Sequence, residues 1–401
     1  MKGKQHFFII LILGALTTLS PFSIDMYLPA FPEIAKDLGS TIPNIQLSLT
    51  SYFIGISFGQ LLYGPLLDRF GRKPPLYAGL VVYILTSFGC VFVHSVNMLI
   101  AMRFIQALGG CVCLVASRAL VRDLFPVSEI AKVFSTLMLV LAASPMLAPT
   151  VGGYVAVAFS WHMIFIILGG IGVLVLLSSI LFLPDGKPAD PTLSLKPRPI
   201  TRSFMTVFRQ SSFFTYALCG SISSSITYAF ISGSPDVFMS LYKVEERTYG
   251  WIFTFIAAAI IGSSQLNRLF LKWFSSKQLI IAALAGQLVL GAVLIAGTAY
   301  NWFGLHGLII MLFLFMLGQG FTFPNASALA IAPFTRLSGT ASALLGALQL
   351  GLGSVTSALV SIFHGQTAMP MVAGMVICAV LSLLILYAGP LIFREEKIEG
   401  L

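Results

Sequence analysis

The sequence predicts an all-α polytopic membrane protein with twelve transmembrane helices in two six-helix, pseudo-symmetric halves. Three observations support this fold class. Of the 401 residues, 57% are hydrophobic and only 9% are charged; the apolar residues form repeated long runs; and Lys and Arg gather on one side of those runs. A soluble protein needs more polar residues to cover its surface. A closed barrel would show alternating strands of about ten residues, whereas the runs here are unbroken.

The apolar runs define twelve spans, each long enough to cross a bilayer as a helix. They cover residues 7–30, 44–66, 76–93, 98–119, 132–155, 161–183, 211–234, 248–270, 278–299, 304–326, 339–362 and 369–393. Lys2 and Lys4 precede the first run, which has no small-residue cleavage pattern. We therefore expect a retained first helix rather than a signal peptide.

The basic residues sort by side when the N-terminus is taken as cytoplasmic. Of the 23 Lys and Arg, nineteen then fall on the cytoplasmic side, three fall on the other side (Lys36, Lys243 and Arg247), and Arg103 lies within a span. Such a bias sets the orientation of a membrane protein. It predicts a multi-pass membrane protein with both termini cytoplasmic, and it assigns the net charge of +9 to the lipid surface rather than to nucleic acid.

The longest loop, residues 184–209, divides the chain into an N-terminal half (1–183) and a C-terminal half (210–401). It holds five prolines and five basic residues and lacks an apolar run long enough for a core. Proline excludes a continuous helix, so we expect a cytoplasmic linker.

The two halves show a faint internal repeat. Asn267-Arg268 lies 199 residues after Asp68-Arg69, at the matching point between the second and third spans of its half. Two six-helix halves related in this way are typical of secondary transporters, which bind substrate at the interface of their halves near the middle of the membrane.

The segment between the second and third spans is densely charged. Asp68, Arg69, Arg72 and Lys73 place four charges within six positions. The basic residues are expected to mark the cytoplasmic membrane face, but orientation does not require the acid. Asp68 therefore indicates a further role.

Two ionisable residues, Asp25 and Arg103, fall inside predicted spans. A charge at the bilayer centre costs about 2.5–3.5 kcal/mol on insertion scales, so each is a functional candidate. Asp25 lies five residues from the predicted outer end of its span and Arg103 five residues from the outer start of its own. Both are thus expected about 8 Å below the outer boundary, at roughly 1.5 Å per residue. The alternative to a functional role is that Asp25 and Arg103 form an ion pair that is purely structural.

Three motifs resemble those of a known transporter group. Gly64-x-Leu66-x-Asp68-Arg69-x-Gly71-Arg72-Lys73 is similar to the signature loop of the major facilitator superfamily. Arg103-Phe-Ile-Gln106-Ala107-Leu-Gly109 resembles its fourth-helix motif, with Ala107 where Gly is more usual. Ser144-Pro-Met-Leu-Ala148-Pro149-Thr-Val-Gly152-Gly153 resembles the fifth-helix antiporter motif, with Ser144 and Ala148 in place of two glycines. Together with Ile24-Asp25-Met-Tyr27-Leu-Pro29-Ala-Phe-Pro32, Gly233-Ser234-Pro235, Pro324-Asn325 and Gly339-Thr-Ala-Ser-Ala, they resemble the Bcr/CflA family of multidrug efflux transporters.

The resemblance implies the major facilitator fold, a place in the bacterial inner (plasma) membrane and a proton-coupled antiporter that exports amphipathic drugs by alternating access. The lack of a large soluble domain suggests a monomer. In that fold the first and fourth helices are neighbours, so Asp25 and Arg103 could meet. Our hypothesis is that Asp25 carries the proton: paired or drug-facing when deprotonated, and dry and protonated when the cavity closes.

The resemblance also implies a cytoplasmic gate and a periplasmic seal. The gate residues would be Gly64, Asp68, Arg69, Gly71, Arg72 and Asp123. Asp68 would meet Arg72, the start of the eleventh helix near Ser338–Thr340, and Asp123. The seal would be the fifth-helix motif, with Pro145, Pro149, Gly152 and Gly153; a helix bent only to fit its neighbours is an equal alternative.

A set of polar and aromatic residues in the spans indicates a substrate cavity: Tyr27, Tyr228, Asp236, Gln319, Asn325 and Gln349. A cavity with few polar anchors would suit varied amphipathic molecules. Tyr228 belongs to a serine-rich span, and small hydroxyl residues also serve simply to pack helices closely. Asp236 either assists a cationic substrate or a proton or simply lies at the water interface, and the second is expected.

Other function classes find little support. The five histidines lie near span ends without an HExxH pair, the five cysteines fall inside apolar spans, and a GxxxxGK phosphate loop is missing. We therefore expect no cofactor, no metal site and no enzyme activity. The nearest alternative is a proton-linked uptake symporter of the same fold.

Overall fold

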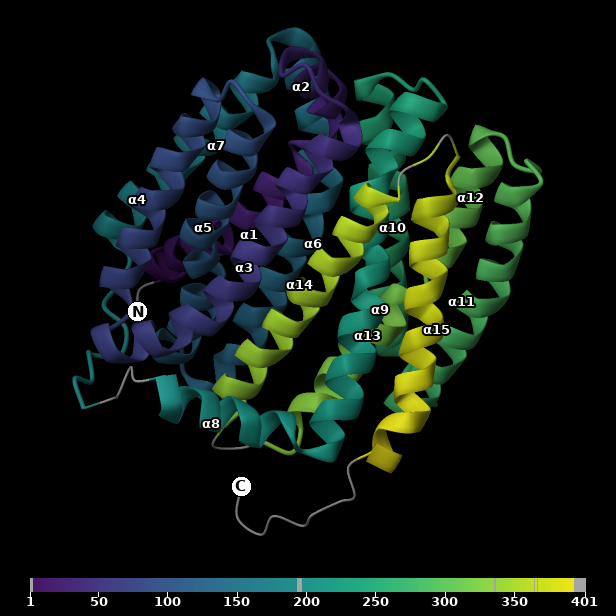
Figure 1. The fold of residues 1–401 in the computed structure, drawn as a ribbon. Helices are drawn as coiled ribbons and strands as arrows, with labels where there is room; N and C mark the ends of the chain where they lie inside the picture. The colour runs from purple at the N-terminus through teal and green to yellow at the C-terminus, as the bar shows by residue number, and fades with distance from the viewer. Residues whose placement is uncertain (1–2, 193–196, 335–336, 364, 366, 393–401) are drawn as a thin grey trace. The chain divides into compact units, whose positions relative to one another are not determined.

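The computed structural model describes residues 3–192, 197–334, 337–363, 365 and 367–392, and every regular element in those residues is a helix (Figure 1). This confirms the predicted all-α class. The chain forms two compact units, Met1–Lys196 and Pro197–Leu401, and their boundary falls inside the predicted linker. Five basic residues used for the orientation lie outside the described residues: Lys2, Lys196, Arg336, Arg394 and Lys397.

The first unit is a bundle of long helices. Its elements are α1 (Gly3–Asp25), a 3-10 turn η1 (Leu28–Ala30), α2 (Phe31–Asp37), α3 (Ile42–Phe70), α4 (Lys73–Gly89), a 3-10 turn η2 (Cys90–Phe92), α5 (Val96–Leu124), α6 (Val127–Ala158) and α7 (Trp161–Phe182). Within this unit α5 packs along both α3 and α4, and α1 packs against α5, α6 and α7.

The second unit begins with a short helix and continues with a second bundle. Its elements are α8 (Pro197–Phe208), α9 (Ser211–Pro235), a π-helical segment η3 (Asp236–Leu241), α10 (Glu246–Phe270), α11 (Ser276–Ala299), α12 (Leu305–Met316), α13 (Gln319–Ile331), α14 (Ser338–Ile362) and α15 (Met369–Ile392). Here α9 is the central helix, since it packs against α13, α14 and α15.

Among the described residues, eleven helical stretches are long and apolar enough to cross a membrane. One of them joins α12 and α13, and another runs from α1 through α2 to Asp37. The predicted span at 211–234 is not among the eleven, although α9 is 25 residues long. Its many serines lower its apolarity, and many of them are buried inside the unit, where neighbouring helices shield their hydroxyls from lipid.

Several predicted helix ends differ from the structure by a few residues, and two of these differences affect candidate residues. The second span was expected to end at residue 66, but α3 continues to Phe70 and α4 begins at Lys73. The charged segment is thus mostly helical, and the turn between the helices is only Gly71 and Arg72. The first span was expected to end near Ala30, whereas its helical path breaks after Asp25 and resumes to Asp37. Asp25 therefore lies further from the outer end of that path than predicted.

The predicted linker contains a helix. Pro197 and Pro199 both fall in the first turn of α8, where a missing N–H breaks no helical hydrogen bond. The prolines exclude a helix across the whole linker but permit one that starts with them. Residues 193–196 of this linker lie outside the described residues.

Small residues bring α3 and α5 into close contact. A Cβ atom added to Gly55 would lie 2.7 Å from the Cβ of Ala107, and one added to Gly59 would lie 2.7 Å from the Cβ of Cys111. Residues four apart share one helix face, so both pairs form a single line of contact. Ala107, which replaces the more usual Gly, still fits because its partner is a glycine. All five cysteines are buried, and none forms a disulfide.

Candidate functional site

The side chain of Arg103 on α5 is completely buried in the first unit and is held by two hydrogen bonds. Its Nη1 donates to Oε1 of Gln106 at 2.6 Å, and its Nη2 donates to the carbonyl oxygen of Ser23 at 2.7 Å. Gln106 lies one helical turn further along α5, so that bond needs no tertiary contact. The bond to Ser23 connects α5 to α1. Among the described residues, Nε of Arg103 has no hydrogen-bond partner.

Three aromatic rings surround the guanidinium. Its Cζ lies 4.2 Å from the ring centroid of Tyr52, 4.7 Å from that of Tyr27 and 5.7 Å from that of Phe165. Such rings stabilise a cation through their electron-rich faces. They come from α3, from the break after α1 and from α7, so the tertiary packing of four segments builds the site.

A polar shell fixes the residues that hold Arg103. Gln106 donates from Nε2 to Oγ of Ser87 at 2.7 Å, and the hydroxyls of Ser23 and Tyr83 share a hydrogen bond of 2.6 Å. Both partners come from α4. Because every buried hydroxyl or amide needs a partner, this shell fixes where Gln106 and Ser23 stand relative to the cation.

Asp25 is the last residue of α1 and is buried. The expected ion pair with Arg103 is not formed: among the described residues, no ion pair or hydrogen bond joins the two. The physical reason lies in the end of α1, whose last carbonyls lack helical partners. Arg103 satisfies the carbonyl of Ser23 instead of reaching the carboxyl group two residues later.

Tyr27, predicted for the substrate cavity, belongs to the surroundings of Arg103. It is fully buried, and its hydroxyl shares a hydrogen bond of 2.7 Å with that of Ser48 on α3. Its ring contacts those of Phe31 and Phe165, with centroids 4.8 and 5.5 Å away. The side chain therefore packs the break between α1 and η1.

The fifth-helix motif packs against that same break. Pro145 and Pro149 lie inside α6, and a Cβ atom added to Gly152 would come within 2.0 Å of the carbonyl oxygen of Met26. No larger residue fits at Gly152 without moving the backbone next to Asp25. Gly153 is also buried. The structure thus places this motif beside the end of α1, which its position in the sequence did not reveal.

The charged segment forms an ion-pair cluster centred on Arg72. Nη1 of Arg72 lies 2.7 Å from Oδ1 of Asp68, and its Nε lies 2.7 Å from Oδ2 of Asp123 at the end of α5. Gly71 has φ +81°, which only glycine adopts at low cost, and this turn aims Arg72 at both acids. Of the partners expected for Asp68, Arg72 contacts it directly, whereas Asp123 joins the cluster through Arg72. Burial alone would lower the pKa of Arg72, but its hydrogen bonds to Asp123 and Asp68 outweigh this and raise it.

The remaining gate candidates lie near this cluster or on the helix leading to it. Gly64 stands inside α3 with nothing within 4 Å of an added Cβ, and the guanidinium of Arg69 lies 5.9 Å from the ring of Phe70. Residues 338–340, the other expected partner of Asp68, belong to the second unit, so this contact stays a prediction.

A segment that the sequence did not single out covers the cluster. After α7 the chain returns over it: the backbone N–H of Lys187 donates to Oδ2 of Asp123 at 2.9 Å, and Nζ of Lys73 lies 2.7 Å from Oδ1 of Asp185. A Cβ added to Gly186 would lie 2.7 Å from Arg72, so glycine allows this close approach. From composition, residues 185–187 were predicted only as part of the cytoplasmic linker.

In the second unit, two amides meet the hydroxyls of α9. Gln319 on α13 donates to Oγ of Ser223 at 3.3 Å, and Gln349 on α14 donates to Oγ of Ser224 at 3.4 Å. The ring of Tyr228 packs against Gly353 of α14, where an added Cβ would lie 2.3 Å from it. Three predicted cavity residues thus gather around α9.

The other two predicted cavity residues lie apart from this group. Asn325 on α13 is buried and donates from Nδ2 to Oδ1 of Asn267 on α10 at 2.8 Å. Its role is therefore a buried amide pair between two helices. Asp236 is half-buried where α9 passes into the π-helical segment η3.

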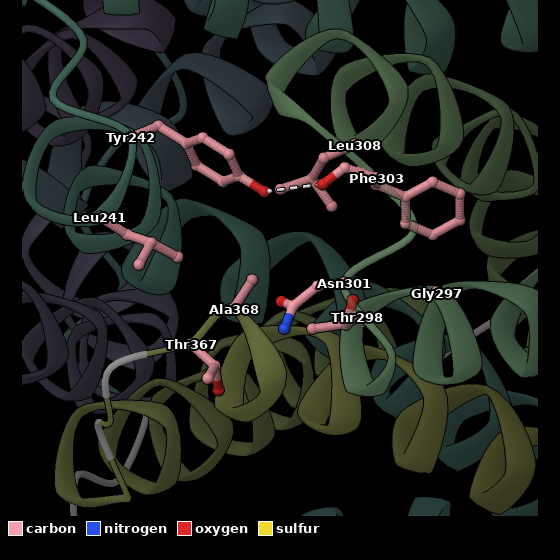
Figure 2. A pocket seen from close by; sticks show the side chains of 9 residues that line it. All are labelled: Leu241, Tyr242, Gly297, Thr298, Asn301, Phe303, Leu308, Thr367 and Ala368. Carbon is pink, nitrogen blue, oxygen red and sulfur yellow. Dashed lines mark hydrogen bonds between the residues drawn. The ribbon is translucent and has the colours of Figure 1, made fainter.

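A pocket of about 260 Å³ opens at one end of the second unit (Figure 2). Its walls come from the end of η3, the end of α11 with the turn that follows, α12, and the residues just before α15: Leu241, Tyr242, Gly297, Thr298, Asn301, Phe303, Leu308, Thr367 and Ala368. Tyr242 closes one side by donating to the carbonyl of Phe303 at 3.4 Å. None of these residues was predicted, because the pocket exists only where four chain segments meet.

The comparisons with known proteins agree with this geometry. A family model described as Major Facilitator Superfamily matches residues 13–358. The chain is 34% identical to a bicyclomycin resistance protein homolog of Haemophilus influenzae, over 96% of this chain and 97% of that protein. It is 36% identical to the uncharacterized MFS-type transporter YdgK of Bacillus subtilis, over 95% and 94%. It is 30% identical to the multidrug resistance protein MdtL of Escherichia coli, over 94% of each.

Solved structures share the fold. A bacterial homolog of the human lysosomal transporter Spinster, in an inward-facing and unoccupied conformation, matches with a TM-score of 0.69 and 15% identity, over 98% of this chain and 97% of that one. A D-xylose–proton symporter matches with a TM-score of 0.70 and 15% identity, over 97% of each chain. At such identities the likeness concerns the fold alone.

Proposed function

The chain belongs to the Major Facilitator Superfamily, within its Bcr/CflA branch, and on this premise we propose that it exports amphipathic drugs from the cytoplasm in exchange for protons. It is a transporter rather than an enzyme. The names of the relatives in Haemophilus influenzae and Escherichia coli, which refer to bicyclomycin and multidrug resistance, support drugs as the substrate class. We further propose that it works as a monomer in the inner membrane, by alternating access, with both termini cytoplasmic.

The observation that carries the proposal is the bond from Arg103 to the carbonyl of Ser23. A cation at the C-terminal end of a helix satisfies an orphan carbonyl and complements the helix dipole. The bond fixes the end of α1 two residues before the buried Asp25. A change in the protonation of Asp25 would then act on the end of α1. This segment has few alternative positions, because Arg103 binds it on one side and Gly152 packs against it on the other.

Asp25 is the proposed proton carrier. A carboxyl group binds and releases a proton as its surroundings change between dry and hydrated. In our proposal Asp25 is protonated while it is buried away from water, and it loses the proton when the cytoplasmic side opens to water or drug. Arg103 keeps the end of α1 in place in both states. Proton entry from outside then favours drug release outward.

The second unit would supply polar anchors for the drug. Gln319, Gln349 and Tyr228 gather around α9, whose serine hydroxyls can donate or accept hydrogen bonds. A few neutral anchors among apolar side chains suit recognition of varied molecules. Asp236 would favour a cationic substrate. The Arg72 cluster would act as the cytoplasmic latch that sets how often the cavity opens inward, and the fifth-helix motif as the outer seal.

The test compares Asp25→Asn with Asp25→Glu. Purified protein in proteoliposomes is given a drug, and proton release is followed with a pH-sensitive dye. We expect drug-evoked proton release to be lost in Asp25→Asn and partly kept in Asp25→Glu, which can still bind a proton. Coupled transport that survives in Asp25→Asn would sink the proposal for Asp25.

A growth assay tests the direction of transport separately. An efflux-deficient host that expresses the protein is challenged with a panel of unrelated drugs at two pH values. Resistance to several of them supports export. Growth on a scarce nutrient without any resistance would favour the uptake symporter instead.

A further inference from the structure

The pocket at one end of the second unit has walls of its own. None of the residues gathered around α9, which are Gln319, Gln349 and Tyr228, lines it. In the predicted orientation this end faces away from the cytoplasm, because Lys243, next to Tyr242, is one of the three basic residues assigned to that side. A cavity of about 150 Å³ takes up benzene, so the volume of about 260 Å³ suits a molecule of about ten non-hydrogen atoms.

The walls combine apolar surface with neutral polar groups. Leu308 is 1% exposed and Ala368 is 4% exposed, and the ring of Phe303 packs over Gly297. Among the described residues that line the pocket, none carries a charge. An ion that left water for this site would find no opposite charge on its walls, so the pocket favours a neutral molecule.

Three side chains offer hydrogen bonds to such a molecule: Tyr242, Thr298 and Asn301. Oγ1 of Thr298 is buried and has no hydrogen-bond partner among the described residues. The hydroxyl of Tyr242 donates to the carbonyl of Phe303 at 3.4 Å, which is long for a hydroxyl donor, so it can exchange this bond for a closer one. Figure 2 shows Thr298 and Asn301 on the side opposite Tyr242. A hydroxyl group, which both donates and accepts, suits this set.

The turn after α11 presents Asn301 between two exposed rings. Asn301 has φ +54°, in the left-handed region that residues other than glycine seldom adopt. Such strained residues are found at ligand clamps, where the surrounding structure fixes them. The rings of Tyr300 and Trp302 stack with centroids 5.7 Å apart and are 72% and 64% exposed. Exposed Tyr and Trp are typical of the membrane–water interface, where amphipathic molecules gather.

We propose that this pocket binds a neutral aromatic alcohol of about ten non-hydrogen atoms, taken from the membrane–water interface on the side away from the cytoplasm. The ring of the ligand would pack against Phe303, Leu308 and Ala368. Its hydroxyl would donate to Oγ1 of Thr298 and accept from the amide of Asn301. Binding here needs neither proton exchange at Asp25 nor the residues around α9, so it can be tested whether or not the protein exports drugs.

The experiment uses the full-length protein in detergent with phenylpropanol as the probe. Leu241→Cys places a thiol on a wall residue that is 41% exposed, while the five native cysteines are buried. Mass spectrometry follows its modification by a water-soluble, charged maleimide as the probe concentration rises. Thr367→Cys provides a second reporter on another wall, and His306→Cys, exposed but outside the walls, is the matched control. Phenylpropylamine and butylbenzene are the cationic and the apolar comparison.

We expect phenylpropanol to protect both wall thiols saturably, by about tenfold at ten times its dissociation constant, because only the empty pocket reacts. The rate for His306→Cys should stay within about twofold, since its thiol is outside the site. Phenylpropylamine should require at least about tenfold higher concentrations, because its charge finds no partner. Failure to protect either wall thiol, equal protection of the control, or equal protection by the amine would each overturn the proposal.

Two further variants test the hydrogen bonds of the site. Thr298→Val keeps the shape and removes a hydroxyl without a partner, so the melting temperature should not fall. Asn301→Gly removes the amide and tolerates the positive φ. We expect each to raise the phenylpropanol concentration for half-protection by about three- to tenfold and to leave that of butylbenzene unchanged. If both variants bind phenylpropanol as the unchanged protein does, the proposed site is wrong.

Discussion

Arg103 on α5 donates a hydrogen bond of 2.7 Å to the carbonyl oxygen of Ser23 on α1. The bond joins the fourth predicted span to the first and ends two residues before the buried Asp25. A backbone carbonyl therefore takes the place that the sequence had suggested for a carboxylate. In our proposal the two residues therefore have separate roles: Arg103 holds the end of α1, and Asp25 changes its charge.

The first prediction concerns the amide that holds Arg103. Gln106→Leu keeps the side-chain volume but leaves Nη1 of Arg103 buried without its partner. We expect a loss of about 1–3 kcal/mol in the free energy of unfolding, the cost of an unsatisfied buried donor. Thermal unfolding of the purified protein in detergent measures it. Gln349→Leu, which breaks a longer bond of 3.4 Å at a half-buried site, is the control and should cost less.

The second prediction concerns the contact between α6 and the end of α1. Gly152→Ala places a methyl group 2.0 Å from the carbonyl oxygen of Met26, so the backbone beside Asp25 must move. We expect a loss of about 3 kcal/mol or more, because backbone cannot swing away as a side chain can. Gly170→Ala in α7 meets nothing within 4 Å and is the control. Equal melting temperatures for the two variants would contradict the predicted contact.

The third prediction ranks the two acids around Arg72. Asp123 is 15% exposed and also accepts the N–H of Lys187, whereas Asp68 is 50% exposed. Asp123→Asn should therefore cost about 2 kcal/mol of stability and Asp68→Asn only about 0.5 kcal/mol, since exposed ion pairs are screened by solvent. Asp68→Asn should nevertheless slow or unbalance drug transport while the protein stays inserted and binds drug. If Asp68→Asn transports drug at the unchanged rate, the prediction is wrong, and the charged segment only orients the protein in the membrane.

The fourth prediction is an absence of pH dependence from Arg72. Its pKa is raised because hydrogen bonds to Asp123 and Asp68 outweigh the effect of burial. A raised pKa means that its stabilising contribution is complete below the ordinary value and is lost only as the pH rises through the still higher folded value. Between about pH 6 and 9 the guanidinium stays charged. The pH profile of transport should keep its shape in Arg72→Gln, even where the rate falls. A profile whose midpoint moves in this variant would show that the prediction is wrong.

The fifth prediction uses the buried amide pair of the second unit. Asn325→Leu leaves Oδ1 of Asn267 without its donor, and we expect a loss of about 1–3 kcal/mol. Changing both residues to Leu removes both polar groups, so the double variant should be more stable than the single one. Unfolding of the two variants in the same detergent compares them. A double variant less stable than Asn325→Leu would mean that the pair matters through its shape rather than its hydrogen bond.

The sequence predicted the helices well because lipid makes the signal strong: long apolar runs with one-sided charge are typical of membrane helices and rare in soluble folds. It was less reliable at helix ends. α3 runs on to Phe70 because charged residues extend a helix into water as readily as they end one, and only Gly71, with its positive φ, stops it. The many serines of α9 make it too polar to count among the apolar helices. Because many of these serines are buried inside the unit, the helix can still be a span.

Candidate residues were predicted by chemical type and not by partner. Asp25, Arg103, Asp68 and Arg72 stand out because charge is rare in this chain. That Asp68 meets Arg72, and that Asp123 lies close by, was expected only from the resemblance to a known family. The bond from Arg72 to Asp123, 51 residues away, was not predicted.

By itself, the sequence determined that this protein is a bundle of membrane helices and which polar residues lie in an apolar setting, and it predicts which side its charges face. Those properties follow from the cost of placing each residue type in lipid or water, which depends on composition and order alone. Only the tertiary structure decided that Arg103 binds the carbonyl of Ser23, that Gly152 meets Met26 and that Lys187 covers Asp123. A backbone carbonyl or N–H belongs to every residue type alike, so its partner is chosen by where two helices cross.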